Sequence, residues 1–258
     1  MNALKIAFIG SGNVAWHLAP ALDGAGHSII QIISRTKENA QKLAAKVGAD
    51  SDTLITNLLP EADICIIAVS DGNLAEVVRQ IPYNRCTVVH TCGSQSIEVL
   101  KGCSENYGIF YPLQTFSKNR AVNMFEVPIM IECNDPNKLD FLRKLGDSIS
   151  NKVFYANSHE RLQYHFSAVL VNNFVNRLFF EAETFLSENN LDFNVLKPII
   201  VETAKKVLEL SPQDAQTGPA LRGDKITLEK HRQLIANNAP LLELYDFLTN
   251  RISNYSVR

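Results

Sequence analysis

The residues with the clearest binding chemistry lie near the start of the chain, in Gly10-Ser11-Gly12-Asn13-Val14-Ala15. Gly10 permits a tight turn, Gly12 lets the backbone approach a diphosphate, and Ala15 allows a helix to pack closely on a strand. The stretch follows an apolar run, Ile6–Ile9, and precedes a predicted helix whose free N–H groups would face an anion. This context predicts a dinucleotide-binding α/β fold, and a glycine turn without a ligand is the alternative.

The end of the second predicted strand, Ser28–Ile33, distinguishes between the two nicotinamide cofactors. An NAD site usually has an acidic residue here, about 20 residues past the glycines, which binds the ribose hydroxyls. This chain has Ser34, Arg35 and Thr36 instead. A guanidinium can stack on adenine and pair with a 2′-phosphate, to which the two hydroxyls can also hydrogen-bond. We therefore expect NADP rather than NAD, and a solvated surface arginine is the alternative.

Two further predicted strands end in polar residues that would border the same site. The runs Ala62–Val69 and Cys86–His90 are apolar, and ligands of open α/β sheets bind beyond the carboxyl ends of the strands. We therefore expect the cofactor site to be lined also by Val69, Ser70, Asp71, Thr91, Cys92 and Gly93. Cys92 is expected to shape the wall, since no neighbouring base would activate it. The segment Tyr111–Phe116 leaves a later strand and is expected to border the same cleft.

The pattern of the chain changes near residue 156, where predicted strands stop. Ser158 is the expected N-cap of one long helix over 159–190, with apolar residues at spacings of three and four. Val169 and Val171 widen its apolar stripe, so we expect a central, mostly buried helix. Further helices are predicted over 194–209, 224–236 and 240–253. The chain is thus expected to form a Rossmann-type parallel-sheet domain, 1–156, followed by an all-α substrate and dimerisation domain, 157–258.

Polar residues on the long helix are candidates for binding a substrate. His165, Asn172 and Asn176 share one face at about 100° per residue, and Asn173 stands beside them. An unpaired polar group on a buried helix costs about 1–3 kcal/mol, so these side chains need partners. A substrate bound between the two domains would supply them, and hydrogen bonds between helices or across a dimer are the alternative.

One more candidate lies in the loop between two later predicted helices. Arg222, within Thr217–Asp224, could bind a carboxylate on the substrate. The alternative is a solvated Arg222 before a helix that Asp224 caps.

Composition excludes several classes of protein. The 258 residues are 46% hydrophobic and 20% charged with a net charge of −2, which is typical of a globular protein and gives no reason to expect nucleic acid or an anionic membrane as partner. No apolar run reaches about 18 residues, and the chain begins directly with a strand, so neither a transmembrane helix nor a signal peptide is predicted. The five cysteines match no zinc pattern and suggest reduced thiols, so we expect a cytoplasmic protein without a metal site.

The glycine fingerprint, the Ser-Arg-Thr strand end and the C-terminal helices together resemble the superfamily of 6-phosphogluconate dehydrogenase-like reductases. That superfamily includes β-hydroxyacid dehydrogenases, pyrroline-5-carboxylate reductase and ketopantoate reductase. Four motifs, His90–Ser94, Tyr111–Phe116, Val171–Phe174 and Gln216–Pro219, more closely resemble a family that joins a Rossmann-like domain to a C-terminal domain of unknown function. That family is labelled as NADP oxidoreductases by similarity to deazaflavin-dependent NADP reductases. The resemblance covers nearly the whole chain and implies NADP as cofactor and a homodimer formed by the helical domains.

One departure from the superfamily bears on catalysis. β-Hydroxyacid dehydrogenases have a lysine three residues before an Asn-Asn pair on the corresponding helix; the lysine transfers a proton and the second asparagine holds the substrate. Asn172-Asn173 matches the pair, but Val169 occupies the lysine position and cannot transfer a proton. We therefore assign the acid–base role to His165, one turn earlier, because imidazole titrates in the useful range.

Two functions remain open at this point. The first is an NADP-dependent oxidoreductase that acts on a small keto or hydroxy acid, or an imine, held against His165, Asn173 and Arg222 in the cleft between the domains. The second is an NADP(H)-binding sensor or scaffold without turnover, which the valine at the lysine position favours. The intact fingerprint and the polar cluster favour the first. Binding of FAD or S-adenosylmethionine would usually require an acidic residue where Arg35 stands.

Overall fold

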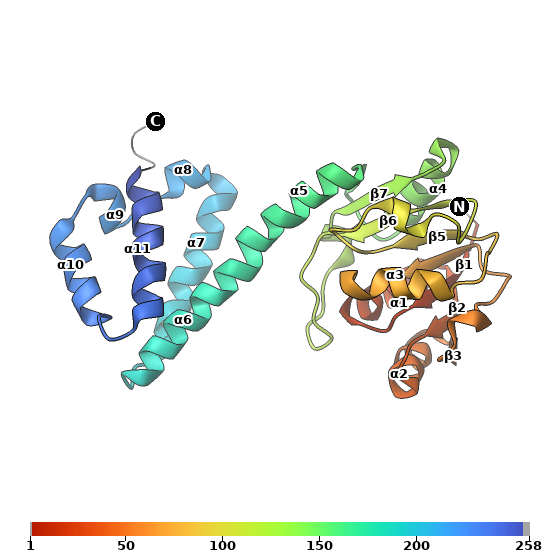
Figure 1. Ribbon diagram of the computed structural model, residues 1–258, viewed down its shortest axis with the longest axis horizontal. Coiled ribbons are helices and arrows are strands. Elements are labelled where there is room, and N and C mark those ends of the chain that lie inside the picture. The colour runs from red at the N-terminus through yellow and green to blue at the C-terminus, as the bar shows by residue number, and fades with distance from the viewer. Residues whose placement is uncertain (1, 255–258) are drawn as a thin grey trace. The chain divides into compact units, whose positions relative to one another are not determined.

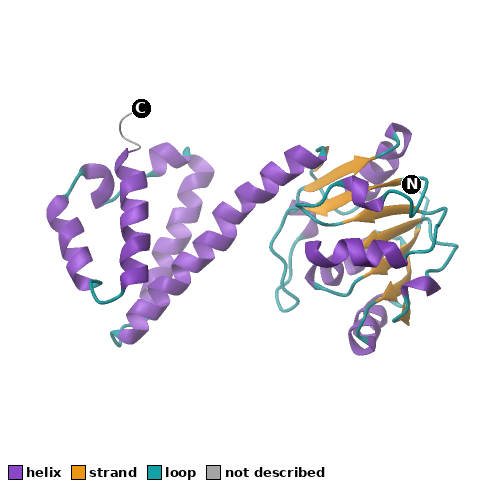
Figure 2. Cartoon of the chain, viewed as in Figure 1, coloured by secondary structure: helices purple, strands orange, loops and turns teal. Residues whose placement is uncertain are grey.

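The computed structural model describes residues 2–254, which divide into two compact units, Met1–Asn173 (unit 1) and Phe174–Arg258 (unit 2). All strands of these described residues lie in unit 1, and the described part of unit 2 is helical (Figure 2). The last strand ends at Tyr155, so residue 156, where we expected the domain boundary, marks the end of the sheet. The compact unit extends further and includes the helix that follows.

Unit 1 is built around a sheet that has eight strands within the described residues, in the order β3-β2-β1-β4-β5-β6-β7-β8 (Figure 1). Strands β1 to β6 run parallel, β7 is antiparallel to β6, and β8 is parallel to β7. The first six strands have the order of the Rossmann fold, which confirms the predicted fold class. The bounds are β1 (Lys5–Ile9), β2 (Ser28–Ile33), β3 (Asp50–Asp52), β4 (Ile64–Ile67), β5 (Thr87–His90), β6 (Tyr107–Pro112), β7 (Ile129–Cys133) and β8 (Val153–Tyr155).

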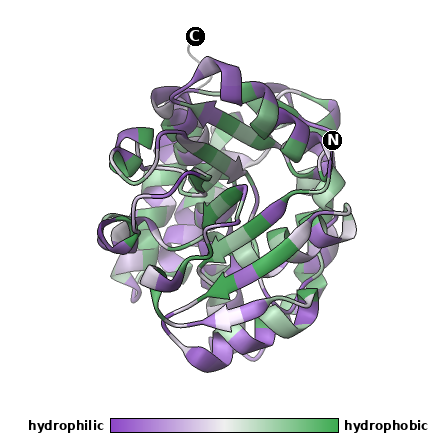
Figure 3. Ribbon diagram, turned by 90° about the vertical axis from the view of Figure 1, so that its right-hand side faces the viewer, coloured by the Kyte–Doolittle hydropathy of each residue, from purple (hydrophilic) through white to green (hydrophobic). Residues whose placement is uncertain are grey.

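Helices cover both faces of this sheet. Alternate residues of a strand point to opposite faces, so Ile6 and Phe8 of β1 join a core with α1, α2 and α4, while Ala7 and Ile9 join the core on the α3 side. Strands covered on both faces must be apolar along their whole length, and Figure 3 shows them largely green. The bounds are α1 (Asn13–Gly24), α2 (Lys37–Val47), α3 (Asp71–Gln80) and α4 (Pro136–Asp147).

Helix α5 (Ser158–Ala168) begins one residue earlier than its expected cap implies. Asn157 is the N-cap; its side chain accepts from the N–H groups of His159 and Glu160, and the Glu160 carboxylate accepts from the Asn157 N–H. The predicted cap, Ser158, instead donates its hydroxyl to the carboxylate of Glu132 on β7, at 2.9 Å. Because Asn157 caps the helix, the Ser158 hydroxyl is available to bond to the sheet.

A buried arginine in that turn attaches α5 to the sheet. Arg161 is fully buried, and its Nη1 lies 2.7 Å from Oε2 of Glu132. Its Nη2 donates to the carbonyl of Gln95, in the loop after β5. Because a charge buried without its partner costs several kcal/mol, this pair holds α5 against both β7 and that loop.

The long helix predicted over 159–190 exists, but it is neither regular nor buried. A π-helical segment, Val169–Phe174, separates α5 from α6 (Val175–Glu188). Phe166 and Leu170 are 59% and 43% exposed, so the expected burial is wrong for the single chain. Apolar periodicity correctly indicates an apolar face, but nothing in the described chain covers it.

Unit 2 is helical, as predicted, and buries few side chains. Its buried residues within the described part are Ala220, Leu228 and Thr249, and the two apolar cores found among residues 2–254 lie in unit 1. The segment expected to be a loop contains two short helices, because prolines and an N-cap serine start a turn there. Besides α6, the bounds are α7 (Lys197–Glu209), α8 (Pro212–Ala215), α9 (Pro219–Arg222), α10 (Lys225–Leu234) and α11 (Ala239–Ser253). None of the helices described in residues 2–254 combines the length and apolar character needed to cross a membrane.

Candidate functional site

The glycine fingerprint forms the predicted turn between β1 and α1. Gly10 has a φ of +111°, and a Cβ at this position would lie 2.2 Å from the carbonyl oxygen of Ala68, so only glycine fits. The Gly10 N–H donates to the carbonyl of Ile33 at 2.7 Å, which ties the turn to β2. No side chain caps α1 at Gly12, so the N–H groups of the first turn, which starts at Asn13, are available to an anion.

A cavity of about 510 Å³ lies beyond the ends of β1, β2 and β4; we call it the cofactor cavity. Ser11 Oγ and Ser34 Oγ are 2.8 Å apart, which joins the fingerprint to the end of β2. Arg35 is exposed and forms no ion pair within residues 2–254, so its guanidinium is available to an anionic ligand. The predicted cofactor residues that line this cavity are Gly10, Ser11, Gly12, Ser34, Arg35, Thr36, Val69 and Ser70.

The remaining predicted cofactor residues lie next to this cavity without lining it. Asn13 and Val14 form the first turn of α1, and Asp71 begins α3. Thr91 and Cys92 are buried, and their side chains donate to backbone carbonyls of the neighbouring strand end. Their side chains therefore face the protein interior, and a cofactor role for these residues stays a prediction.

Several residues that line the cofactor cavity are missing from the sequence-based prediction. They come from four elements that are far apart in the sequence, and no local motif marks them. Lys118, in the loop after β6, contributes a positive charge to the cavity in addition to that of Arg35. Its Nζ lies 5.0 Å from the centre of the Trp16 ring. The missed polar residues are Asn39, Thr53, Asn73, Glu76, Gln80 and Lys118.

A second group of predicted residues gathers around His165 on α5. Its Nδ1 lies 3.1 Å from Oη of Tyr111, and a Cβ on Gly93 would lie only 2.6 Å from the same Nδ1. Gly93 thus lets the loop after β5 pass close to the imidazole. Burial, assisted by the negative charge of Asp71, raises the pKa of Tyr111 to about 12, so the phenol is protonated at neutral pH and can donate to Nδ1. The sequence places Tyr111 near the cleft but does not predict this pair.

His165 and Asn173 line one cavity of about 410 Å³, together with Tyr111. We call this cavity, which lies within unit 1, the His165 cavity. Asn172 also lines it, although neighbouring residues of a regular helix point about 100° apart. Both asparagines belong to the π-helical segment, an irregularity that is frequent at functional sites. Val169, at the position of the lysine in related dehydrogenases, lines the same cavity.

Arg222, the third predicted catalytic residue, belongs to unit 2. It is exposed at the end of α9 and forms no ion pair in the described part of the chain. Asp224 caps α10 by accepting from the N–H of Thr227 at 3.1 Å, the arrangement that we gave as the alternative. A role for Arg222 at the substrate stays a prediction.

The ionisation of the groups around Gly93 is set by burial and hydrogen bonds. Burial opposes ionisation of Asp71, but the N–H and hydroxyl of Ser94 donate to its carboxylate and bring its pKa below the ordinary value. Burial, with the positive charge of Arg161, lowers the pKa of His90 to about 4. Asp71 is therefore a carboxylate at neutral pH, and His90 is a neutral imidazole.

The fold and the fingerprint define a dinucleotide-binding protein of the Rossmann class, and comparisons identify its family. Residues 5–91 match a family model described as NADP oxidoreductase, coenzyme F420-dependent, and residues 127–252 match a domain of unknown function, DUF2520. The chain is 38% identical to the "putative NADP oxidoreductase" of Bacteroides fragilis; the match covers 98% of each chain, with a TM-score of 0.92. The chain belongs to this family of NADP oxidoreductases, and the predicted resemblance is confirmed.

More distant solved structures share the fold. A protein from Thermotoga maritima is 21% identical over 98% of this chain and 100% of that one, with a TM-score of 0.82. An imine reductase from Myxococcus stipitatus, in complex with NADP+, is 15% identical over 97% of this chain and 93% of that one, with a TM-score of 0.65. At these identities the likeness shows the fold alone. A search of curated proteins finds no match.

The cysteines are free thiols, and residues 2–254 contain no group of three or more His, Cys, Asp or Glu that could hold a metal ion. The cytoplasmic location inferred from the cysteines stays a prediction.

The burial of these thiols predicts their reactivity. Burial raises the pKa of Cys65 and Cys92 far above the ordinary value, that of Cys86 to about 12 and that of Cys103 to about 11. Because the thiolate is the nucleophile, we expect these four thiols not to react with a disulfide reagent at pH 8 in the folded protein, while the half-buried Cys133 reacts slowly. All five should react after unfolding in guanidinium chloride. Fast labelling of Cys92 in the folded protein, located by peptide mass spectrometry, would contradict its placement in the interior.

Proposed function

We propose that the protein is an NADP-dependent oxidoreductase that transfers a hydride between NADP(H) and a small keto or hydroxy acid, or an imine. The observation that carries this proposal is a continuous set of contacts from the cofactor cavity to His165. Ser70 lines the cofactor cavity and precedes Asp71, whose carboxylate accepts from Ser94. Ser94 follows Gly93, whose backbone lies against the imidazole of His165. A cofactor bound along the strand ends would thus extend toward a group that can transfer a proton.

The residues of the cofactor cavity fit a phosphorylated dinucleotide. The turn at Gly10 and Gly12 leaves room for a diphosphate, which the first turn of α1 would bind through its N–H groups. Arg35, with the hydroxyls of Ser34 and Thr36, would bind the 2′-phosphate. The cofactor supplies the hydride chemistry, and membership of an NADP oxidoreductase family supports its identity.

The proton would be exchanged through His165, whose imidazole ring can give or accept a proton and accepts a hydrogen bond from Tyr111. In the reducing direction the pair would give a proton to the carbonyl oxygen or imine nitrogen of the substrate. Asn173 would orient that substrate in the His165 cavity, as the matching asparagine does in the β-hydroxyacid dehydrogenases. Arg222 would bind a substrate carboxylate.

The second candidate is an NADP(H)-binding sensor or scaffold that does not turn over. Val169 favours it, because the His165 cavity contains an apolar side chain at the position of the superfamily's proton-transferring lysine. Measuring NADPH absorbance with a panel of keto acids and imines distinguishes the two: the wild-type protein should oxidise NADPH with at least one of them if the first candidate is correct.

We also propose a homodimer formed through the helical part of the chain. Val195, Leu208 and Phe180 are 75%, 85% and 52% exposed, and each buried apolar side chain is worth about 1.5–3 kcal/mol. A second copy that covers these side chains would provide the core that unit 2 lacks in the single chain. In analytical ultracentrifugation we expect twice the mass of one chain at micromolar concentration, and the mass of one chain would contradict the proposal.

Replacing Arg35 tests the cofactor preference. We expect Arg35→Ala to lower the affinity for NADPH at least tenfold and to leave the affinity for NADH within about twofold of the wild-type value. The reason is that a hydrogen bond to a charged group is worth about 1.5–3 kcal/mol. Calorimetry with both cofactors measures this. Arg85→Ala, which removes an exposed arginine outside the cofactor cavity, should change neither affinity. Equal losses of both cofactors in Arg35→Ala would overturn the preference for NADP.

Replacing His165 tests the acid–base role. We expect His165→Ala to lower turnover about 10²- to 10⁴-fold, the usual contribution of a general acid or base, and to leave NADPH affinity unchanged. His159→Ala is the matched control, since His159 is an exposed histidine on the same helix. Steady-state kinetics of both variants, with the substrate identified in the NADPH absorbance panel, would measure the loss of turnover. Turnover retained in His165→Ala would remove this residue from the mechanism.

A further inference from the structure

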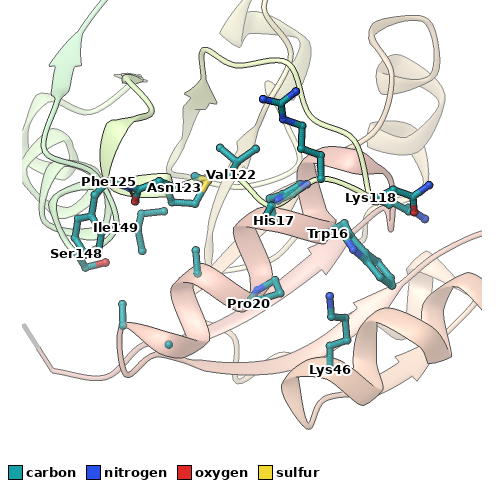
Figure 4. Close-up of a pocket in the computed structure, with 17 residues that line it drawn as sticks. Trp16, His17, Pro20, Lys46, Lys118, Val122, Asn123, Phe125, Ser148 and Ile149 are labelled. Atoms are coloured by element: carbon teal, nitrogen blue, oxygen red, sulfur yellow. Dashed lines mark hydrogen bonds between the residues drawn. The ribbon is translucent and has the colours of Figure 1, made fainter.

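A cavity separate from the cofactor cavity and the His165 cavity runs alongside α1. It has a volume of about 680 Å³ and is bounded by α1, the end of α2, the loop 118–125 and the residues after α4 (Figure 4). We call it the α1 groove. None of the residues predicted to bind cofactor or substrate lines it.

One end of the α1 groove carries positive charge. Lys46, Lys118 and Arg120 line it, and no carboxylate is among its lining residues. None of these three cations forms an ion pair in the described chain, 2–254. The ammonium groups of Lys46 and Lys118 lie 4.2 and 5.0 Å from the centre of the Trp16 ring. Both ammonium groups therefore lie at the same end of the groove, where both would attract a bound anion.

The other end of the α1 groove is apolar. Figure 4 shows Phe125 and Ile149 at the end opposite Lys46 and Lys118, with Pro20 between them. Phe125 is 52% exposed, so a ligand placed here would remove apolar surface from water. A charged end and an apolar end within one cavity favour a ligand that has the same two parts.

We propose that the α1 groove binds a small amphipathic organic anion. The anionic head group, a carboxylate or a phosphate, lies at Lys46 and Lys118, and the apolar body lies toward Phe125 and Ile149. Ligand sites of this volume typically combine an apolar lining with a few charged groups that orient the ligand. Lys118 lines both this groove and the cofactor cavity, whereas Lys46 and the apolar residues line the groove and not the cofactor cavity, so Lys46 is the residue that distinguishes the two sites.

Trp16 is the only tryptophan of the chain and lines the α1 groove, so its fluorescence reports binding there. We would titrate the full-length protein with decanoate and with decyl phosphate, below the concentrations at which they form micelles, and follow the emission of Trp16. We expect a saturable change with at least one of them; the tighter of the two identifies the head group. Decanol lacks the charge, and inorganic phosphate lacks the apolar body. Each should half-saturate the protein only at a concentration at least tenfold higher than the tighter of the two anions.

A charge-removing variant makes the test specific. Lys46→Met keeps the apolar stem of the side chain and removes the ammonium group. We expect it to lower the affinity for the amphipathic anion at least tenfold without changing the affinity for NADPH. Lys144→Met is the control, because Lys144 is exposed on α4 and pairs with Asp140. Calorimetry on the same variants covers the case in which binding leaves the emission unchanged. The proposal is overturned if neither method detects binding, if decanol binds as tightly as the anions, or if Lys46→Met and Lys144→Met behave alike.

Discussion

The buried ion pair between Arg161 and Glu132 attaches the long helix to the sheet, and the geometry around His165 depends on it. Arg161 lies one turn before His165, and it also donates to the carbonyl of Gln95, two residues after Gly93. The same side chain therefore fixes both the helix and the loop that meet at the imidazole. Its Nε has no hydrogen-bond partner in the described residues, a cost that the pair must offset. Removing one partner of such a pair typically costs about 3–5 kcal/mol.

The parallel sheet brings the two halves of the proposed chemistry to one edge. The turn at Gly10 and the end of β2 form the cofactor cavity, and the loop after β5 connects that edge to α5 through Asp71 and Ser94. In this arrangement the backbone of the glycine turn would bind the diphosphate. The proton would be carried by His165, which is positioned by contacts between residues far apart in the sequence. The α1 groove belongs to the same unit, and Lys118 lines both it and the cofactor cavity.

Features set by local sequence were predictable, and features set by contacts between distant segments were not. The fingerprint turn, the apolar strands and the presence of the longer helices follow from neighbouring residues. Strand β3, Asp50–Asp52, is polar and short, so no apolar pattern marks it. Tyr111 and His165 are 54 positions apart, and Lys118 reaches its cavity from a loop without a motif. The burial of the long helix was wrong because an apolar stripe indicates that a face is apolar, not what covers it.

The account rests on a cofactor that lies across the fingerprint and ends at the imidazole. A crystal structure of the protein with NADPH tests this most directly. We predict density for the diphosphate at the first turn of α1, the 2′-phosphate at Arg35, and the nicotinamide ring next to Gly93, facing His165 and Tyr111. Density for the nicotinamide away from Gly93, or for the diphosphate away from the turn at Gly10, would contradict it.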